Sequence, residues 1–147
     1  SDSLSAGKGK DNSGEIIQER MLSFGLESAD VQVVEDDLEM IENAVKQLIE
    51  NYQVIILTGG TGLSNRDVTP EAILPLLDKR LIGAEETIRR FGQERMPYAM
   101  LSRSVVGTIG KSLVLALPGS SKGVAESLDA VFPALFHSFK VLDGERH

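Results

Sequence analysis

A glycine-rich loop with the sequence TGGTG follows an apolar run and suits the binding of a phosphate-bearing ligand. Its residues are Thr58, Gly59, Gly60, Thr61 and Gly62. Glycines let the backbone approach a ligand closely and turn its N–H groups toward an anion, while threonines add hydroxyl groups. A plain tight turn would need only one glycine. The loop matches neither the dinucleotide fingerprint nor the Walker A spacing, so we predict a binding loop of another kind.

A carboxylate lies shortly after this loop. Asp67 stands between Arg66 and the start of a predicted helix, where an anion is stabilised by the helix dipole. Capping that helix is its alternative role, but Thr69 suits the N-cap position and Pro70 suits the first helical position. Asp67 is therefore available as a ligand for Mg²⁺.

Two adjacent carboxylates, Asp36 and Asp37, offer a second metal ligand. Carboxylates in the first turn of a helix are ordinary, so either residue also suits a capping role. Magnesium is commonly held by one or two carboxylates together with substrate phosphates, so a pair such as Asp36 and Asp67 is chemically sensible.

Three further segments resemble anion sites. Pro118, Gly119 and Ser120 precede a predicted helix whose free amides suit an anion, although a Pro-Gly turn explains them equally well. Arg103 offers a planar guanidinium fork for phosphate, or else a surface charge. The segment 107–111 resembles the end of a Walker A loop, but the first glycine is missing and a strand follows, so we predict a hairpin turn there.

Strand and helix patterns alternate along the chain and position these residues. Buried strands are typically followed by ligand-binding loops at their carboxyl ends, where the glycine loop, Asp36 and Gly119 would meet. We predict an α/β fold, a three-layer α/β/α sandwich with a mostly parallel sheet. The predicted elements are a loop at 5–15, helices at 16–24 (ending at Gly25), 36–52, 69–81, 83–97 and 121–142 (kinked at Pro133), and strands at 30–34, 54–57 and 112–117.

Composition excludes several classes of protein. The net charge of −7 and the low aromatic content argue against nucleic-acid binding. No apolar run is long enough to span a membrane. Cysteine is absent and there are only two histidines, His137 and His147, which excludes thiolate sites and a histidine-built zinc site.

The length of 147 residues fits one domain, residues 1–147. Chains of this class open with a buried central strand, whereas the sequence SDSLSAG at Ser1 contains no apolar run. We expect such a strand upstream of Ser1, which would make this domain part of a longer chain. The alternative is a sheet that lacks the strand, which stability disfavours.

The motifs SDS, SAGKGKDNSG, VVEDDLEMI, TGGTGLSNRDVTPEA, AMLSR and LPGSSKGV occur in the order and spacing of the molybdopterin adenylyltransferase family. The chain resembles this family, which includes MogA, MoaB and the G domain of gephyrin, from Ser1 to about His137. The resemblance implies an α/β cytoplasmic homotrimer that works with other proteins of molybdenum cofactor biosynthesis. It also implies a nucleotidyltransferase that adenylylates molybdopterin with Mg-ATP and releases pyrophosphate.

The resemblance also implies roles for individual residues. Asp67 matches the essential aspartate of the family and Asp36 matches its second acidic position, so both are expected to act in catalysis and to bind Mg²⁺. The nucleotide-contacting positions are Thr58, Gly59, Gly60, Thr61, Gly62, Pro118, Gly119 and Ser120, and those near the pterin or its phosphate are Asp2, Ser3, Ser102 and Arg103.

The sequence departs from the family pattern at one position, and two alternative functions stay open. The family often has proline where this chain has Glu35, which leaves the choice between Asp36 and Asp37 undecided. The chain retains the Arg-Asp-Val step that inactive MoaB relatives lose, which favours an enzyme. The alternatives are a module that binds molybdopterin without adenylylating it and a domain of the molybdate-inserting MoeA type, against which RDVTPE argues.

Overall fold

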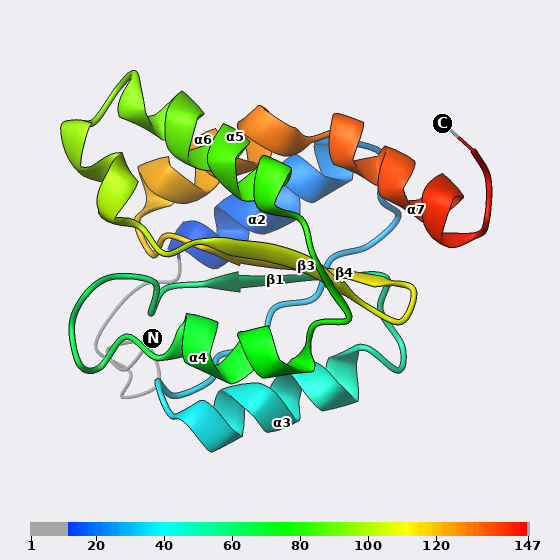
Figure 1. Ribbon diagram of the computed structural model, residues 1–147, viewed down its shortest axis with the longest axis horizontal. Coiled ribbons are helices and arrows are strands. Elements are labelled where there is room, and N and C mark those ends of the chain that lie inside the picture. The colour runs from blue at the N-terminus through cyan, green and yellow to red at the C-terminus, as the bar shows by residue number, and fades with distance from the viewer. Residues whose placement is uncertain (1–11, 147) are drawn as a thin grey trace.

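A four-stranded mixed sheet forms the centre of the protein (Figure 1), and the computed structural model describes residues 12–146. The strand order is β1-β4-β3-β2, with β1 parallel to β4 and the other neighbours antiparallel. In the described part of the chain the sheet is therefore mixed and not mostly parallel as predicted, because a tight turn at residues 110–111 joins β3 and β4 as a hairpin. The strands are β1 Val54–Thr58, β2 Lys79–Arg80, β3 Val105–Ile109 and β4 Ser112–Leu117.

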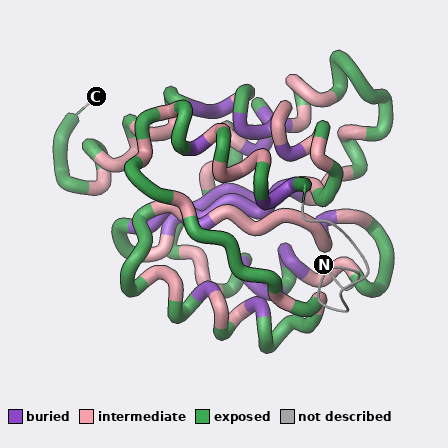
Figure 2. The backbone as a smooth tube through the Cα atoms, turned by 180° about the vertical axis from the view of Figure 1, so that it is seen from behind, coloured by how far each residue is buried: buried purple, intermediate pink, exposed green. Residues whose placement is uncertain are grey.

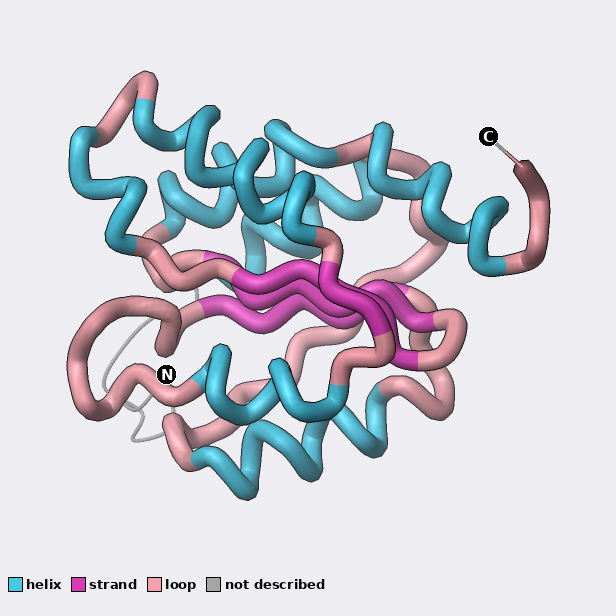
Figure 3. The backbone as a smooth tube through the Cα atoms, in the orientation of Figure 1, coloured by secondary structure: helices cyan, strands magenta, loops and turns pink. Residues whose placement is uncertain are grey.

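Helices cover both faces of the sheet and make the predicted three layers (Figure 3). Helices α2, α5, α6 and α7 lie on one face, and α3 and α4 lie on the other (Figure 1). The helical segments are α2 Asn12–Ser23, α3 Leu38–Leu48, α4 Thr69–Ile73, η1 Leu74–Leu76, α5 Ile82–Gln93, η2 Pro97–Leu101, α6 Ser121–Val131, η3 Ala134–Phe136 and α7 His137–Leu142.

Two apolar cores flank the sheet because alternate side chains of its strands point to opposite faces. Leu113, Leu115 and Leu117 pack with α2, α5 and α6, whereas Val114 and Ala116 pack with α3 and α4. All six residues of β4 are buried, which explains why its sequence reads as a continuous apolar run (Figure 2). The central strand thus fixes the loops at its carboxyl end to a rigid base.

Several predicted boundaries move. Residues 12–15, predicted as the end of a loop, belong to helix α2, and the rest of that predicted loop lies outside the described residues. Gly25 follows the helix with φ +104° as expected. The predicted helix 69–81 changes to a 3₁₀ turn at Leu74, because Pro75 lacks an N–H group, and β2 follows it. Pro133 also follows the end of α6 at Val131 instead of kinking one long helix.

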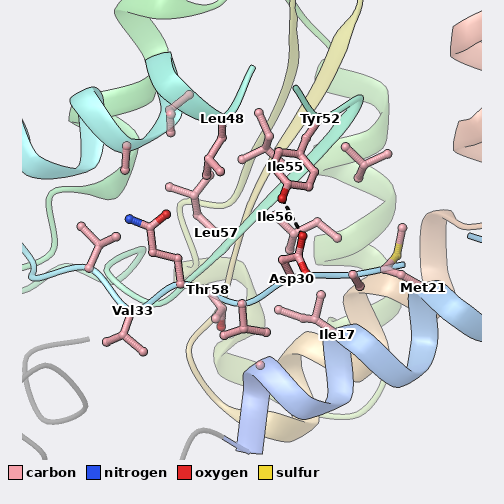
Figure 4. A pocket seen from close by; sticks show the side chains of 18 of the residues that line it. Ile17, Met21, Asp30, Val33, Leu48, Tyr52, Ile55, Ile56, Leu57 and Thr58 are labelled. Atoms are coloured by element: carbon pink, nitrogen blue, oxygen red, sulfur yellow. Dashed lines mark hydrogen bonds between the residues drawn. The ribbon is translucent and has the colours of Figure 1, made fainter. Parts of the chain in front are cut away.

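The predicted strand at residues 30–34 is not formed. This segment has no regular secondary structure and, among the described residues, β1 pairs only with β4, while a cavity of about 390 Å³ separates the segment from β1. A strand needs a hydrogen-bonded neighbour, and the cavity occupies the place where one would lie. The cavity is largely apolar: Ile17 and Met21 of α2 border one side, and Ile55 and Leu57 of β1 border another (Figure 4).

Within residues 12–146 no helix is both long and apolar enough to cross a membrane.

Candidate functional site

The glycine loop and the loop after β4 meet at the carboxyl edge of the sheet. The backbone N–H of Gly59 donates to the carbonyl of Leu117 at 3.0 Å, and the hydroxyl of Thr58 donates to the carbonyl of Pro118 at 2.8 Å. A Cβ atom at Gly119 would lie 3.2 Å from the Cα of Gly59. Because the backbones approach this closely, the two predicted nucleotide loops form one surface.

Helix α4 is tied to the same loop through Thr69. Its hydroxyl donates to the carbonyl of Gly59 at 3.0 Å and its N–H donates to the carbonyl of Gly60 at 3.1 Å. Thr69 was predicted to cap α4, but Val68 occupies the N-cap position and Thr69 is the first helical residue. Gly60 has φ +67°, and a Cβ atom there would lie 2.3 Å from the Thr69 hydroxyl. Glycine is therefore required at position 60.

Asp67 closes a short loop, residues 62–67, which we call the Asp67 loop. The backbone N–H of Ser64 donates to Oδ2 of Asp67 at 3.1 Å, and the N–H of Asp67 donates to the carbonyl of Ser64 at 3.0 Å. A Cβ atom at Gly62 would lie 2.9 Å from Oδ2 of Asp67. The half-buried carboxylate of Asp67 thus lies directly against Gly62, the last glycine of the TGGTG loop.

Arg103 contacts the protein with three of its side-chain nitrogens. Nε donates to the carbonyl of Gly62 and Nη2 to the carbonyl of Asp67, both at 2.8 Å, and Nη1 donates to Glu71. The hydrogen bond from Arg103 lowers the pKa of Glu71 below its ordinary value of 4.5. A guanidinium has five N–H groups, so most of the predicted phosphate fork is already engaged.

The structure assigns different positions to Asp36 and Asp37. Oδ1 of Asp37 accepts a hydrogen bond from the N–H of Met40 at 2.9 Å and caps α3. Asp36 is half-buried and borders the cavity together with Thr58 and Thr69. Asp36 therefore lies on the same side as the glycine loop, while Asp37 caps the helix.

The remaining predicted positions also have protein partners. The hydroxyl of Ser120 caps α6 by accepting from the N–H of Gly123 at 3.0 Å, and the hydroxyls of Ser102 and Ser104 lie 2.9 Å apart. Thr61 is buried, with its carbonyl accepting from the N–H of Arg103. Asp2 and Ser3 lie outside the described residues.

Sequence reasoning missed Ser13. This buried residue at the start of α2 donates its hydroxyl to the carbonyl of Gly119 at 2.9 Å, so α2 supports the loop after β4. No local pattern signals this role, because a serine in a predicted polar loop is unremarkable. The contact joins residues 106 positions apart.

The described residues form no metal cage built from protein ligands alone. Among the described residues, no group of three or more histidine, cysteine, aspartate or glutamate side chains could hold a metal ion. Magnesium commonly takes one or two carboxylates and completes its shell with water and substrate phosphates. Asp67 beside the glycine loop and Asp36 near Thr58 fit this second kind of site.

Comparisons with known proteins give one consistent result. The family described as probable molybdopterin binding domain matches residues 1–137. A molybdenum cofactor biosynthesis bifunctional protein of Chlorobaculum tepidum is 36% identical over the whole chain, which spans 47% of that relative. A molybdopterin adenylyltransferase of Helicobacter pylori is 38% identical over 92% of the chain and 79% of its own length.

Solved structures agree with the fold. The molybdopterin biosynthesis enzyme MoaB of Thermus thermophilus superposes with a TM-score of 0.90 at 38% identity, covering 99% of this chain and 92% of that one. The chain thus spans about half of the length of the Chlorobaculum tepidum protein and most of the length of the Helicobacter pylori and Thermus thermophilus proteins.

Proposed function

The chain belongs to the family of the probable molybdopterin binding domain, and from this membership we propose that it is a molybdopterin adenylyltransferase. It acts in molybdenum cofactor biosynthesis, the process that appears in the name of the relative from Chlorobaculum tepidum. The reaction transfers AMP from ATP to molybdopterin and releases pyrophosphate. The relative named for this activity matches 92% of the chain, which favours an enzyme over a module that only binds molybdopterin.

One observation carries the proposal. The glycine loop, the loop after β4 and the carboxylate of Asp67 lie at one edge of the sheet, with Gly119 packed against Gly59 and Asp67 against Gly62. Backbone this close can present N–H groups to phosphates without intervening side chains. A nucleotide site with an adjacent acidic residue is the arrangement that AMP transfer requires.

The proposed site divides the work among its residues. The segments 58–62 and 118–120 bind ATP. Ser102, together with Asp2 and Ser3, contacts molybdopterin. Arg103 supports the Asp67 loop through its hydrogen bonds to the carbonyls of Gly62 and Asp67. Asp67 and Asp36 would hold Mg²⁺, which supplies positive charge to the phosphates of ATP. In a chain of net charge −7, such a cation offsets the repulsion between two anionic substrates.

The chemistry needs no covalent intermediate. A phosphate oxygen of molybdopterin attacks the α-phosphorus of ATP, a new P–O bond forms, and the bond to the β-phosphate oxygen breaks as pyrophosphate leaves. The protein contributes position and charge stabilisation: the two loops align the phosphates, and their backbone amides stabilise the developing negative charge.

The test is transfer of AMP from ATP labelled at the α-phosphate, in the presence of Mg²⁺ and molybdopterin. We expect labelled molybdopterin and an equal amount of pyrophosphate. Asp67→Asn keeps an acceptor for the N–H of Ser64 but removes the charge, so we expect transfer to fall by about 10²-fold or more while molybdopterin binding persists. Binding without transfer by the wild type would support the binding module instead, and normal transfer by Asp67→Asn would exclude the metal role.

We further propose a cytoplasmic homotrimer, as the resemblance implies. The segment of η2 and its flank exposes the apolar side chains of Met96, Tyr98 and Met100, and exposed apolar patches often mark contact surfaces. Light scattering on the purified protein should give three times the chain mass. A monomeric mass at high protein concentration would contradict this assembly.

A further inference from the structure

We propose that Glu85 and Arg89 of α5 are positioning residues that hold the Asp67 loop in place by acting through Arg103. Neither residue belongs to the predicted site. The consequence for AMP transfer rests on the proposed function, but the mechanical role of the two residues rests only on their contacts.

The contacts run from Glu85 through Arg89 to Arg103, and we call this series of contacts the relay. It begins at the buried carboxylate of Glu85. Glu85 lies in the first turn of α5 with its side chain fully buried, an expensive location for a charge unless it is well paired. Arg80 donates to both of its carboxylate oxygens at 2.9 Å, and the backbone N–H of Val106 donates to it at 3.1 Å. The carboxylate is therefore fixed between α5, β2 and β3.

Arg89 connects this anion to the segment that carries Arg103. One of its terminal nitrogens lies 3.6 Å from the Glu85 carboxylate, one helical turn away. The other donates to the carbonyl of Ser104 at 3.0 Å, and the carbonyl of Ser102 lies at the limit of its reach at 3.5 Å. These carbonyls flank Arg103 on either side, so Arg89 restrains the backbone from which the Arg103 side chain projects.

Arg103 completes the relay by contacting both ends of the Asp67 loop. Its side chain donates to the carbonyls of Gly62 and Asp67, and its backbone N–H donates to the carbonyl of Thr61 at 2.8 Å. A planar guanidinium with donors in a fixed geometry sets the distance between the two loop ends. The position of the Asp67 carboxylate therefore depends on where α5 holds Arg103.

Replacing Arg89 allows an effect on the position of the Asp67 loop to be distinguished from an effect on the stability of the whole protein. Without Arg89, the Glu85 carboxylate still keeps Arg80 and the N–H of Val106, so no buried charge is left unpaired. The contacts that are lost lie at the backbone of Ser102 and Ser104. Replacing Arg89 should consequently loosen the Asp67 loop more than the core.

The experiment measures amide hydrogen exchange by NMR in the ligand-free protein, comparing Arg89→Gln with Arg90→Gln, an exposed arginine on the same helix. We expect exchange at the amides of Asp67 and Arg103 to rise about fivefold or more in Arg89→Gln, relative to the core amide of Val114, and to stay unchanged in Arg90→Gln.

A second variant tests the route. Arg103→Lys keeps the charge but loses the fork, so it should speed exchange at Asp67 in the same way. If the two residues act in series, the double variant should exchange no faster than the faster single variant. Unchanged exchange in Arg89→Gln, an equal rise at Val114, or additive effects in the double variant would each overturn the relay.

Activity gives an independent measurement. Arg89→Gln should lower kcat for AMP transfer several-fold with little change in the KM for ATP, because loop position affects the transition state more than ground-state binding. If the wild type transfers no AMP, the proposed function fails, but the exchange comparison still decides whether Arg89 positions the loop.

Discussion

At the scale of single residues, two neighbouring carboxylates have separate tasks. Asp37 caps α3 through the N–H of Met40, whereas Asp36 is half-buried and borders the cavity near Thr58. The charges are the same, but the backbone turns one side chain toward its own helix. A sequence with both residues in a helical first turn cannot distinguish them.

We expect charge removal at these two positions to have different results. Asp36→Asn should lower AMP transfer by about tenfold or more with little effect on stability, if Asp36 helps to hold the metal. Asp37→Ala, which removes the cap, should destabilise the protein by about 1 kcal/mol and leave the transfer rate of the folded enzyme unchanged. Thermal unfolding and kcat measured on both variants check this. The reverse pattern would make Asp37 the ligand.

The ion pair of Glu71 with Arg103 predicts a pH dependence. The hydrogen bond from Arg103 lowers the pKa of Glu71 in the folded protein below 4.5, so the pair stabilises the fold above that pH. This contribution is lost as the pH falls through the lowered pKa. The Tm advantage of the wild type over Glu71→Gln should accordingly be present at neutral pH and vanish in acid.

Glu86→Gln, which removes another exposed glutamate, provides the control for this comparison. It should shift Tm little at any pH, since surface charges away from such contacts contribute little. A Tm difference between the wild type and Glu71→Gln that stays constant into acid would exclude the ion pair as its cause.

At the scale of elements, the glycine loop is fixed by β1, β4 and α4 together. Gly59 and Gly60 both have positive φ, but an added Cβ atom would meet another residue only at Gly60, where it would lie 2.3 Å from the hydroxyl of Thr69. The loop therefore combines a backbone requirement at two positions with a packing requirement at one.

Alanine at these two positions separates the two requirements. Gly59→Ala should cost about 1 kcal/mol of backbone strain, because no atom lies within 4 Å of the new Cβ. Gly60→Ala should cost about 2–4 kcal/mol, since the strain adds to a 2.3 Å clash that displaces Thr69. Urea unfolding measures both. Equal losses would show that the contact with Thr69 does not constrain the loop.

At the scale of the whole molecule, β1 is an open edge of the described sheet, beside an apolar cavity. Tyr52, which borders this cavity, donates to Asp30 at 2.5 Å and so connects the residues just before β1 to the segment 30–34 (Figure 4). That hydrogen bond also raises the pKa of Tyr52 above its ordinary value of 10.0. The strand predicted ahead of Ser1 stays a prediction, and this edge is where the fold has room for one.

An extended apolar peptide should therefore bind at this edge as an added strand. A peptide of about six residues with alternating valine and isoleucine should raise Tm by about 5 °C or more at roughly 100 times its Kd. The same peptide with a central proline, which cannot complete the hydrogen bonds, should have little effect. No shift in Tm at saturating peptide would show that the edge does not accept a strand.

The sequence by itself determined the elements whose patterns are local. The apolar run of β4, the amphipathic spacing of α3, the Gly25 stop and the α/β class follow from periodicity and from residues with special backbone geometry. The glycine loop stands out for the same reason, because three glycines within five residues are more than a tight turn needs. The binding role of this loop and the metal role of Asp67 stay predictions. These features depend on neighbours within a few positions of the chain.

Tertiary structure decided everything that depends on partners distant in sequence. Residues 30–34 have strand composition but no strand beside them in the part of the chain that the structure describes, and the direction of β3 follows from its pairing with β4. The sequence offers Arg103 as a phosphate fork or else a surface charge, and its protein acceptors lie 32 to 41 positions away. Hydrogen bonds and ion pairs are satisfied in space and not along the chain, so only the folded structure shows which charges remain for a ligand.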